Sequence, residues 1–167
     1  MISKEYKDLL LELRKQRSRW GSTGHKHAHS VITLAEQVKA QSVLDYGAGE
    51  QTLKDHVDLE YYAYDPAVPG IDKRPIEECD IAVALDVLEH VEPIYTEAVL
   101  EDIWNHAKKG VFLYIPLTEA VAILPDGRNA HINLRPADEW FSLTSKLGPT
   151  SIRAEATKRY IKIYLYK

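Results

Sequence analysis

The stretch SVLDYGAGEQTL, residues 42–53, constrains the fold more than any other part of the sequence. Its first residues are largely apolar and suit a strand, and Gly47 and Gly49 come directly after them. A polar, helix-compatible segment follows the two glycines. Because glycine has no Cβ, such a turn lets the backbone bend sharply and approach a bound molecule closely. The order of strand, glycine turn and helix predicts one unit of an α/β fold.

Further apolar runs predict the remaining elements of one sheet and its helices. We expect strands at 61–65, 80–87, 110–116, 151–156 and 158–167. The five apolar residues between Asp80 and Asp86 indicate a strand that is buried on both faces. Apolar residues recur at helical spacing elsewhere, and we expect helices at 4–16, 29–40, 94–109 and 136–147.

This order of elements predicts one α/β domain over residues 1–167, with a mostly parallel sheet and an antiparallel hairpin of the last two strands at its edge. Within it, residues 1–41 should provide N-terminal helices and a loop that covers the glycine turn. Residues 42–116 should form the binding core, and residues 117–167 a substrate loop and the closing strands. The loop 117–136 and the first 20 residues should supply specificity.

Two acidic residues at strand ends indicate the kind of molecule that the turn holds. Asp45 lies two places before Gly47, where a carboxylate would repel a pyrophosphate but attract an ammonium group. Asp65 ends the next strand about 20 residues later, where a carboxylate can accept hydrogen bonds from ribose hydroxyls. Thr52 breaks the dinucleotide pattern G-x-G-x-x-G. S-adenosylmethionine, an adenosine joined to an amino acid, therefore fits these residues better than NAD(P).

LDYGAG, YAYDP and DIAVALDVLEHV occur in this order and resemble three motifs of the class I S-adenosylmethionine-dependent methyltransferases. The chain looks closest to short, phage-type methyltransferase-like proteins, which also carry a PDGRNAH-type segment. The resemblance covers residues 40–116 and implies a Rossmann-like class I methyltransferase sandwich. Only fifteen positions separate Asp65 from Asp80, so the sandwich should be shortened between strands 2 and 4. Gln51 stands where the family often has a third glycine.

By position, the resemblance also implies a cofactor site at the strand ends. The glycine turn would cradle the methionine part, Asp65 would take the ribose hydroxyls, and residues 85–87 would lie under the sulfonium. Ile71 or Ile76 would cover the adenine. Independently of the resemblance, the loop at residues 20–30 should close over the cofactor, with Trp20 or Lys26 near its carboxylate. The implied cofactor-binding residues are Asp45, Tyr46, Gly47, Ala48, Gly49, Tyr64, Asp65, Pro66, Leu85, Asp86 and Val87.

A second group of residues follows the third motif. Asp86, Glu89 and His90 have the spacing of one helical face, and His131 lies in the loop after the strand at 110–116. Together they could hold a divalent ion, Mg²⁺ or Mn²⁺. The pattern is similar to the metal site of small-RNA 3′-terminal 2′-O-methyltransferases and of some ubiquinone-pathway O-methyltransferases. Without a metal, His90 or His131 would be the general base.

The PDGRNAH segment leaves two interpretations open. Arg128 and Asn129 could bind the substrate, or they could complete a turn made by Asp126 and Gly127.

Composition narrows the function. The formal net charge of −4 gives no bulk attraction to nucleic acid, and neither a (D/N)PP(Y/F) motif nor a Pro-Cys nucleophile is present, so duplex DNA is disfavoured as a partner. One cysteine and no membrane-length apolar run predict a cytoplasmic protein without a membrane partner. We expect a methyltransferase of EC 2.1.1 type, acting on an oxygen or nitrogen acceptor of a small molecule or of an RNA or sugar end. The alternatives are a non-catalytic S-adenosylmethionine-binding protein and, less favoured, an NAD(P)-dependent oxidoreductase.

Overall fold

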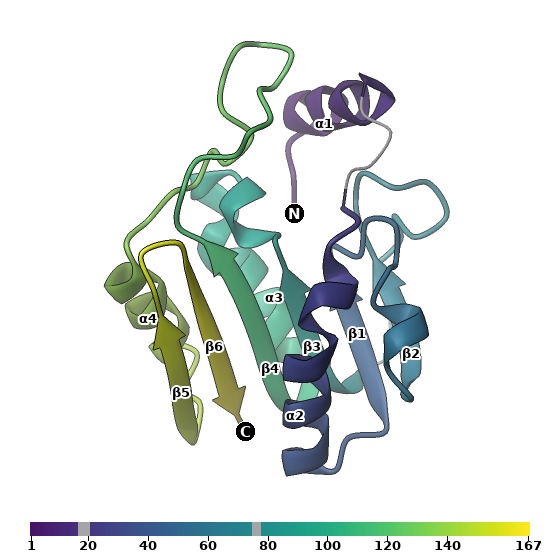
Figure 1. Ribbon diagram of the computed structural model, residues 1–167, viewed down its shortest axis with the longest axis vertical. Coiled ribbons are helices and arrows are strands. Elements are labelled where there is room, and N and C mark those ends of the chain that lie inside the picture. Colours follow the sequence, from purple (N-terminus) through teal and green to yellow (C-terminus); the bar gives the residue numbers. More distant parts are fainter. Residues whose placement is uncertain (17–20, 75–77) are drawn as a thin grey trace.

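A six-stranded sheet forms the middle layer of the protein in a computed structural model (Figure 1). The structure describes residues 1–16, 21–74 and 78–167. The strands are β1 (Ser42–Tyr46), β2 (Glu60–Tyr64), β3 (Cys79–Leu85), β4 (Ala107–Pro116), β5 (Ser151–Ala156) and β6 (Tyr160–Tyr166). Their spatial order is β2-β1-β3-β4-β6-β5. The first four strands run parallel, and β6 runs antiparallel to both β4 and β5. The predicted α/β sandwich with an antiparallel edge hairpin is therefore confirmed.

Helices cover both faces of this sheet. The α-helices are α1 (Lys4–Gln16), α2 (Ala28–Val38), α3 (Thr96–His106) and α4 (Ala137–Ser145). Short 3₁₀ helices are η1 (Gly24–His27), η2 (Lys54–His56), η3 (Leu88–His90) and η4 (Pro93–Tyr95). Figure 1 shows α2 in front of the sheet and α3 and α4 behind it. Among the described residues between β2 and β3 there is no helix, which agrees with the predicted shortening there.

The alternation of side chains along the strands produces two hydrophobic cores. Val43 of β1 packs with Leu34 of α2 on one face, and the next residue, Leu44, packs with Ile103 of α3 on the other. In β3, all five apolar residues between Asp80 and Asp86 are buried and divide between the two cores. The predicted two-sided burial of this strand is confirmed.

The boundaries of several elements differ from those predicted. The helix expected to reach Lys109 ends at His106, and β4 begins at Ala107 because this residue pairs with Cys79 of β3. Lysine and alanine are good helix formers, so the strand pairing here overrides local propensity. The helix expected to reach residue 40 ends at Val38, where Lys39 adopts a left-handed φ of 51° and closes the helix.

Helix α1 packs away from the sheet. Its buried residues Tyr6 and Leu13 form a third, separate cluster with Ala122, Leu124 and Ala130 of the loop 117–136. Figure 1 shows α1 beyond the carboxyl ends of the strands, beside this loop. The two segments form one cap over the edge of the sheet where α/β folds bind ligands. No helix in the described part of the chain is long and apolar enough to cross a membrane.

Candidate functional site

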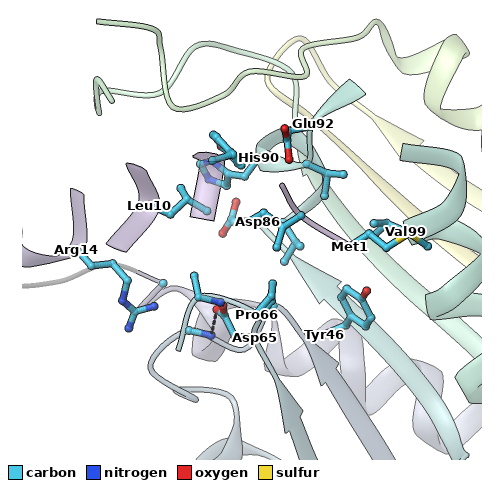
Figure 2. Close-up of a pocket in the computed structure, with 18 of the residues that line it drawn as sticks. Met1, Leu10, Arg14, Tyr46, Asp65, Pro66, Asp86, His90, Glu92 and Val99 are labelled. Carbon is cyan, nitrogen blue, oxygen red and sulfur yellow. Dashed lines mark hydrogen bonds between the residues drawn. The ribbon is translucent and has the colours of Figure 1, made fainter. Parts of the chain in front are cut away.

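A cavity of about 320 Å³ lies between the carboxyl ends of β1, β2 and β3 and helix α1 (Figure 2). Its size falls at the lower end of the range for small-molecule sites. It is lined by the N-terminal segment, the ends of β1, β2 and β3, the glycine turn, the segment 90–99 and the loop 117–136. The lining residues are Met1, Ile2, Tyr6, Leu10, Arg14, Gly21, Thr23, Tyr46, Gly47, Gly49, Asp65, Pro66, Ala67, Asp86, Val87, His90, Val91, Glu92, Val99 and His131.

The glycine turn is held in a conformation that other residues would not tolerate. The backbone N–H of Gly47 donates to the Tyr64 carbonyl at 2.6 Å. Gly49 has a left-handed φ of 52°, and a Cβ on it would lie 2.6 Å from the Gly21 carbonyl oxygen. The backbone of residue 21 therefore rests directly on the turn, and the N–H of Glu50 donates to that same carbonyl at 3.0 Å. The segment that covers the turn and the turn itself thus form one wall.

The structure brings seven of the predicted cofactor-binding residues to the cavity. They are Tyr46, Gly47, Gly49, Asp65, Pro66, Asp86 and Val87. Ala48, Tyr64 and Leu85 lie outside the lining and are buried in or beside the core. Ile71 and Lys26 also lie outside it, and Ile76 and Trp20 fall outside the described residues.

The structure places Asp45 away from the cavity. Its side chain points to the α2 face of the sheet, is 3% exposed, and accepts a hydrogen bond of 2.7 Å from the Tyr61 hydroxyl. Burial raises the pKa of this carboxyl to about 6, although the hydrogen bond from Tyr61 opposes the rise. The ammonium contact predicted for Asp45 has no counterpart in this geometry. Alternation along β1 directs the Asp45 side chain to the α2 face of the sheet, outside the cavity.

Asp65 stands where the sequence predicts it, directly after β2. Its two carboxylate oxygens accept hydrogen bonds from the backbone N–H groups of Gly49 at 3.0 Å and Ala67 at 2.8 Å. Burial raises its pKa, and these two hydrogen bonds limit the rise. Each oxygen keeps a second lone pair, so the carboxylate can still accept hydrogen bonds from two hydroxyls in the cavity.

Asp86 lies at the end of β3 and faces the cavity from the other side of the glycine turn. The Thr23 hydroxyl donates to its Oδ2 at 2.5 Å, and Nε2 of His27 lies 3.5 Å from the same oxygen. Burial alone would raise the pKa of Asp86, but the contacts with His27 and Thr23 bring it below its usual range. Its φ of 57° is left-handed, which is rare for a residue with a side chain.

Glu89, His90 and His131 come together next to Asp86. One potential ligand atom from each of the three lies within 4.8 Å of the others. The Nε2 atoms of His90 and His131 are 3.7 Å and 3.8 Å from Oε1 of Glu89. Asp86 is not part of this group, so the structure assembles three of the four residues that the sequence predicts for a metal.

The hydrogen bonds of both imidazoles leave the same nitrogen directed at Glu89. Nδ1 of His90 lies 2.7 Å from the Ala130 carbonyl, and Nδ1 of His131 lies 2.5 Å from the Thr118 carbonyl. Because a carbonyl only accepts, the Nδ1 of each imidazole must carry a proton, and Nε2 is the atom that a neutral ring would offer to a metal. Histidines that bind metals are typically held in this way.

Glu89 is the most unusual member of the group. Its side chain is fully buried, and within the described residues neither carboxylate oxygen has a hydrogen-bond partner. Burial, and then the charge of Asp86, raise its pKa well above the usual range. Burial and the neighbouring His131 lower the pKa of His90 to about 4. A carboxylate buried without a hydrogen-bond partner needs a nearby cation if it is to carry its charge.

The loop that carries His131 is folded by Asn129. The Asn129 side chain accepts hydrogen bonds from the N–H groups of Ala120 and His131 at 3.0 Å and 2.9 Å, and donates to the Ala120 carbonyl at 2.9 Å. The Arg128 side chain forms an ion pair of 2.6 Å with Asp126. For Asn129, these contacts favour the structural interpretation over substrate binding.

A second, more open cavity of about 500 Å³ adjoins the first. Glu92 and His131 line both cavities, and Ile94, Arg128 and Ile132 contribute to the second one. A molecule in the second cavity can therefore reach His131, which also lines the first.

Sequence reasoning missed the side chains that line the cavity from the N-terminal segment. It predicted helix α1 and a covering loop, but not that Tyr6, Leu10, Arg14 and Thr23 would face the cavity. The apolar face of α1 indicated that the helix packs against another segment, but not which segment. That partner, the loop 117–136, lies more than 100 residues away in the sequence.

No protein-family model matches the chain, and no curated protein gives a significant match. Solved structures do match. The 1,6-didemethyltoxoflavin-N1-methyltransferase of Burkholderia thailandensis, solved with S-adenosylhomocysteine, is 16% identical, with a TM-score of 0.66 over 98% of this chain and 89% of that chain. The methyltransferase domain of the bacterial protein CtHen1-CN is 16% identical, with a TM-score of 0.63 over 84% of this chain and 97% of that chain.

An O-methyltransferase family protein, also from Burkholderia thailandensis, is 12% identical, with a TM-score of 0.65 over 87% of this chain. The chain spans only 57% of that protein, and 51% of human N-acetylserotonin methyltransferase, which is solved with S-adenosylmethionine. At these identities the likeness concerns the fold. The chain has the Rossmann-like fold of S-adenosylmethionine-dependent methyltransferases.

Proposed function

We propose that this chain is an S-adenosylmethionine-dependent methyltransferase that acts on an oxygen or nitrogen acceptor of a small molecule or of an RNA or sugar end. One observation carries the proposal: a single cavity contains the glycine turn, the carboxylate of Asp65, and the paired imidazoles of His90 and His131. The first two suit the cofactor, and the imidazoles lie where an acceptor can reach them. The resemblance to phage-type proteins stays a prediction, because none of the structures compared above is described as phage-encoded.

The described residues offer a group for each part of the cofactor. The turn at Gly47 and Gly49 would cradle the methionine part, and Asp65 could accept hydrogen bonds from both ribose hydroxyls. Pro66, Ala67 and the apolar residues of the N-terminal segment offer apolar surface for the adenine. S-adenosylmethionine, when bound, supplies an electrophilic methyl group, so the protein has mainly to position an acceptor in line with it.

A divalent ion, Mg²⁺ or Mn²⁺, fits the group formed by Glu89, His90 and His131. Neither oxygen of the buried Glu89 carboxylate has a hydrogen-bond partner among the described residues, and the Nε2 atoms of the two imidazoles lie 3.7 Å and 3.8 Å from its Oε1. When bound, the ion would supply Lewis-acid chemistry that lowers the pKa of an acceptor hydroxyl. The pattern resembles that of small-RNA 3′-terminal 2′-O-methyltransferases, which favours a ribose hydroxyl as the acceptor.

In the absence of a metal, His131 is the better candidate for the general base. It lines both cavities, so its Nε2 can contact an acceptor that enters from the second one. His90 shares the first cavity but has a pKa of about 4, far below the value at which an imidazole accepts a proton efficiently near neutrality.

Calorimetric titration with S-adenosylmethionine and S-adenosylhomocysteine tests the cofactor, and we expect binding in the micromolar range. Transfer of a labelled methyl group to a short single-stranded RNA with a free 3′-terminal ribose, and to a catechol, tests the acceptor class. We expect activity that Mn²⁺ or Mg²⁺ stimulates.

Three results would count against the parts of this proposal. Absence of binding to either cofactor form would refute the methyltransferase function. Full activity after exhaustive EDTA treatment would refute the metal. A biological effect that survives the His90→Ala and His131→Ala substitutions would favour a non-catalytic S-adenosylmethionine-binding protein.

A further inference from the structure

We propose that Asp86, and not Asp45, binds the ammonium group of the methionine part of S-adenosylmethionine, and that Thr23 of the covering segment holds it in place. This inference rests on the proposed function, because it concerns the same cofactor. It assigns to Asp86 a role different from that of a metal ligand.

The order of the strands sets the geometry. β2 and β3 flank β1 on opposite sides, so Asp65 and Asp86 stand on opposite sides of the glycine turn that follows β1. Figure 2 shows Asp86 between Asp65 and His90 in the lining of the cavity. The cofactor carries ribose hydroxyls on one side of its sulfur and an ammonium group on the other. With the ribose at Asp65, the amino-acid end extends across the turn toward Asp86.

The surroundings of Asp86 form a pocket for a small polar group. Val87, the next residue, lies against Gly47 so closely that a Cβ on Gly47 would be 2.5 Å from a Val87 methyl carbon. Gly21 and Thr23 close the cavity from the other side. The amino-acid end of a ligand would therefore be enclosed by the turn, by the end of β3 and by the covering segment.

The carboxylate of Asp86 has one oxygen engaged and one available. Oδ2 accepts the hydrogen bond from Thr23, whereas Oδ1 accepts none within the described part of the chain. An ammonium group has three N–H donors and a positive charge, so it can donate a charged hydrogen bond to Oδ1. The left-handed backbone of Asp86, held by a hydrogen bond from its N–H to the Tyr114 carbonyl at 3.1 Å, fixes the direction of the side chain.

The other carboxylates near the cavity are less suitable. Asp45 is 3% exposed, bonded to Tyr61 and outside the lining. Glu92 accepts a hydrogen bond from the N–H of Ser3 at 2.7 Å and lies at the border with the second cavity. Glu89, His90 and His131 form the candidate metal site without Asp86. That site therefore does not require the Asp86 carboxylate.

The test compares three ligands by calorimetry on the wild type and on Asp86→Asn. S-adenosylmethionine has both the ammonium and the sulfonium charge, S-adenosylhomocysteine keeps only the ammonium, and 5′-methylthioadenosine has neither the amino acid nor the charges. Loss of a charged hydrogen bond should weaken binding of the first two ligands by about 10- to 100-fold. Binding of 5′-methylthioadenosine should change by less than about 2-fold, since it does not reach Asp86.

Asp65→Asn is the matched control, because it should weaken all three ligands through the ribose. Asp86→Gly is the second variant, and glycine accepts the left-handed backbone, so this chain should fold even if the asparagine variant does not. Asp86→Gly should also bind S-adenosylmethionine and S-adenosylhomocysteine more weakly and bind 5′-methylthioadenosine normally. Thr23→Val should show a smaller loss in the same direction. Thermal unfolding of each variant checks that the fold is retained.

Several outcomes would overturn the inference while leaving the proposed function intact. Unchanged affinity for S-adenosylhomocysteine in Asp86→Asn would do so, and a loss restricted to S-adenosylmethionine would assign Asp86 to the sulfonium. If Asp45→Asn instead weakens binding of the two ammonium-bearing ligands selectively, Asp45 is the residue that binds the ammonium group. A loss of Mn²⁺ affinity in Asp86→Asn with normal cofactor affinity would make it a metal ligand. If the wild type binds none of the three ligands, the proposed function fails and the inference fails with it.

Discussion

The side of the cavity that we propose for the cofactor, the cofactor side, is made from residues that directly follow strands. The side that we propose for the acceptor, the acceptor side, is made from segments that meet only through tertiary packing. Gly47, Gly49, Asp65 and Asp86 each lie within a few residues of a strand end. On the acceptor side, Tyr6 of α1 packs on a loop more than 100 residues away, and that loop carries His131. The first side is held by the sheet, and the second by its own small cluster.

The difference has consequences for both stability and recognition. Parts of a site that are fixed by the sheet share its stability, whereas a cap with a separate cluster can open by itself. A rigid cofactor side together with a less tightly held acceptor side would allow one fold to serve different acceptors. The predictions below test whether the two sides are as different as this arrangement implies.

Gly49→Ala should have the largest effect, on the cofactor side. A Cβ there would lie 2.6 Å from the Gly21 carbonyl oxygen and 2.8 Å from its Cα, with a φ of 52°. Neither backbone can move without disturbing β1 or the covering segment. We expect a loss of about 4 kcal/mol in the free energy of unfolding, from backbone strain and the clash together, measured by denaturant titration.

Gly148→Ala is the matched control. Its φ of 76° is also left-handed, but nothing lies within 4 Å of the added Cβ. Only the backbone strain of about 1–2 kcal/mol should remain. Equal destabilisation by both substitutions would show that the close contact between residues 21 and 49 does not hold the turn.

Glu89→Gln should have the next largest effect, at the border of the two sides. The folded-state pKa of Glu89 lies above its unfolded value, so its ionisation destabilises the fold as pH rises from the unfolded pKa toward the folded one. In EDTA at pH 7.5 the substitution should therefore raise stability by about 2–3 kcal/mol, and near pH 4 the gain should disappear.

Thermal unfolding with and without Mn²⁺ completes this test. The wild type should gain stability from the ion, because a ligand that binds only the folded state stabilises it. Glu89→Gln should gain little. A similar gain in both proteins would place the ion elsewhere.

Much of the cofactor side could be predicted from the sequence because its signals are local. The apolar run before Gly47 and the acidic residue after β2 identify a strand end and its turn without knowledge of the rest of the chain. The part played by Asp45 depended on the direction of its side chain at the end of a five-residue strand, which the sequence does not specify. Alternation turned it toward α2, where Tyr61 binds it.

The acceptor side was predicted only as segments. The spacing of Glu89 and His90 suggested a group, and His131 was expected from the correct loop. The third residue of the helical face, Asp86, is instead held by Thr23, because the chain turns through a left-handed residue before η3 begins. The packing of α1 on the loop has no local signature.

Asp45→Asn should have a smaller effect, which depends on pH. The pKa of Asp45 is about 6 in the folded state, above the value of about 3.9 for an unfolded aspartate. Its ionisation therefore opposes folding, and the wild type should lose about 1–2 kcal/mol between pH 5 and pH 8 from this group alone. The asparagine variant should lack this loss, as measured by the midpoint of urea unfolding across that range. An identical pH dependence in both proteins would mean that Asp45 titrates normally and is more exposed to water than its 3% accessibility implies.

Leu13→Ala should have the smallest effect on global stability, and it addresses the separateness of the acceptor side most directly. Leu13 and Leu34 are both buried helical leucines, but Leu34 belongs to the core between α2 and the sheet, and Leu13 to the cluster between α1 and the loop 117–136. Leu34→Ala should lower the free energy of unfolding by about 2–5 kcal/mol, as in other cores.

If the cap is a separate cooperative unit, Leu13→Ala should change that free energy by less than about 1 kcal/mol, because the sheet remains folded when α1 detaches. The loss should appear as faster hydrogen exchange, by about 10-fold or more, at the amides of α1 and of residues 120–132. Amides of β1 and β3 should keep their protection. Equal destabilisation by the two leucine substitutions would mean that cap and sheet unfold together. The acceptor side would then be as stable as the cofactor side. Its assembly from segments distant in the sequence would make it harder to predict, but not easier to unfold.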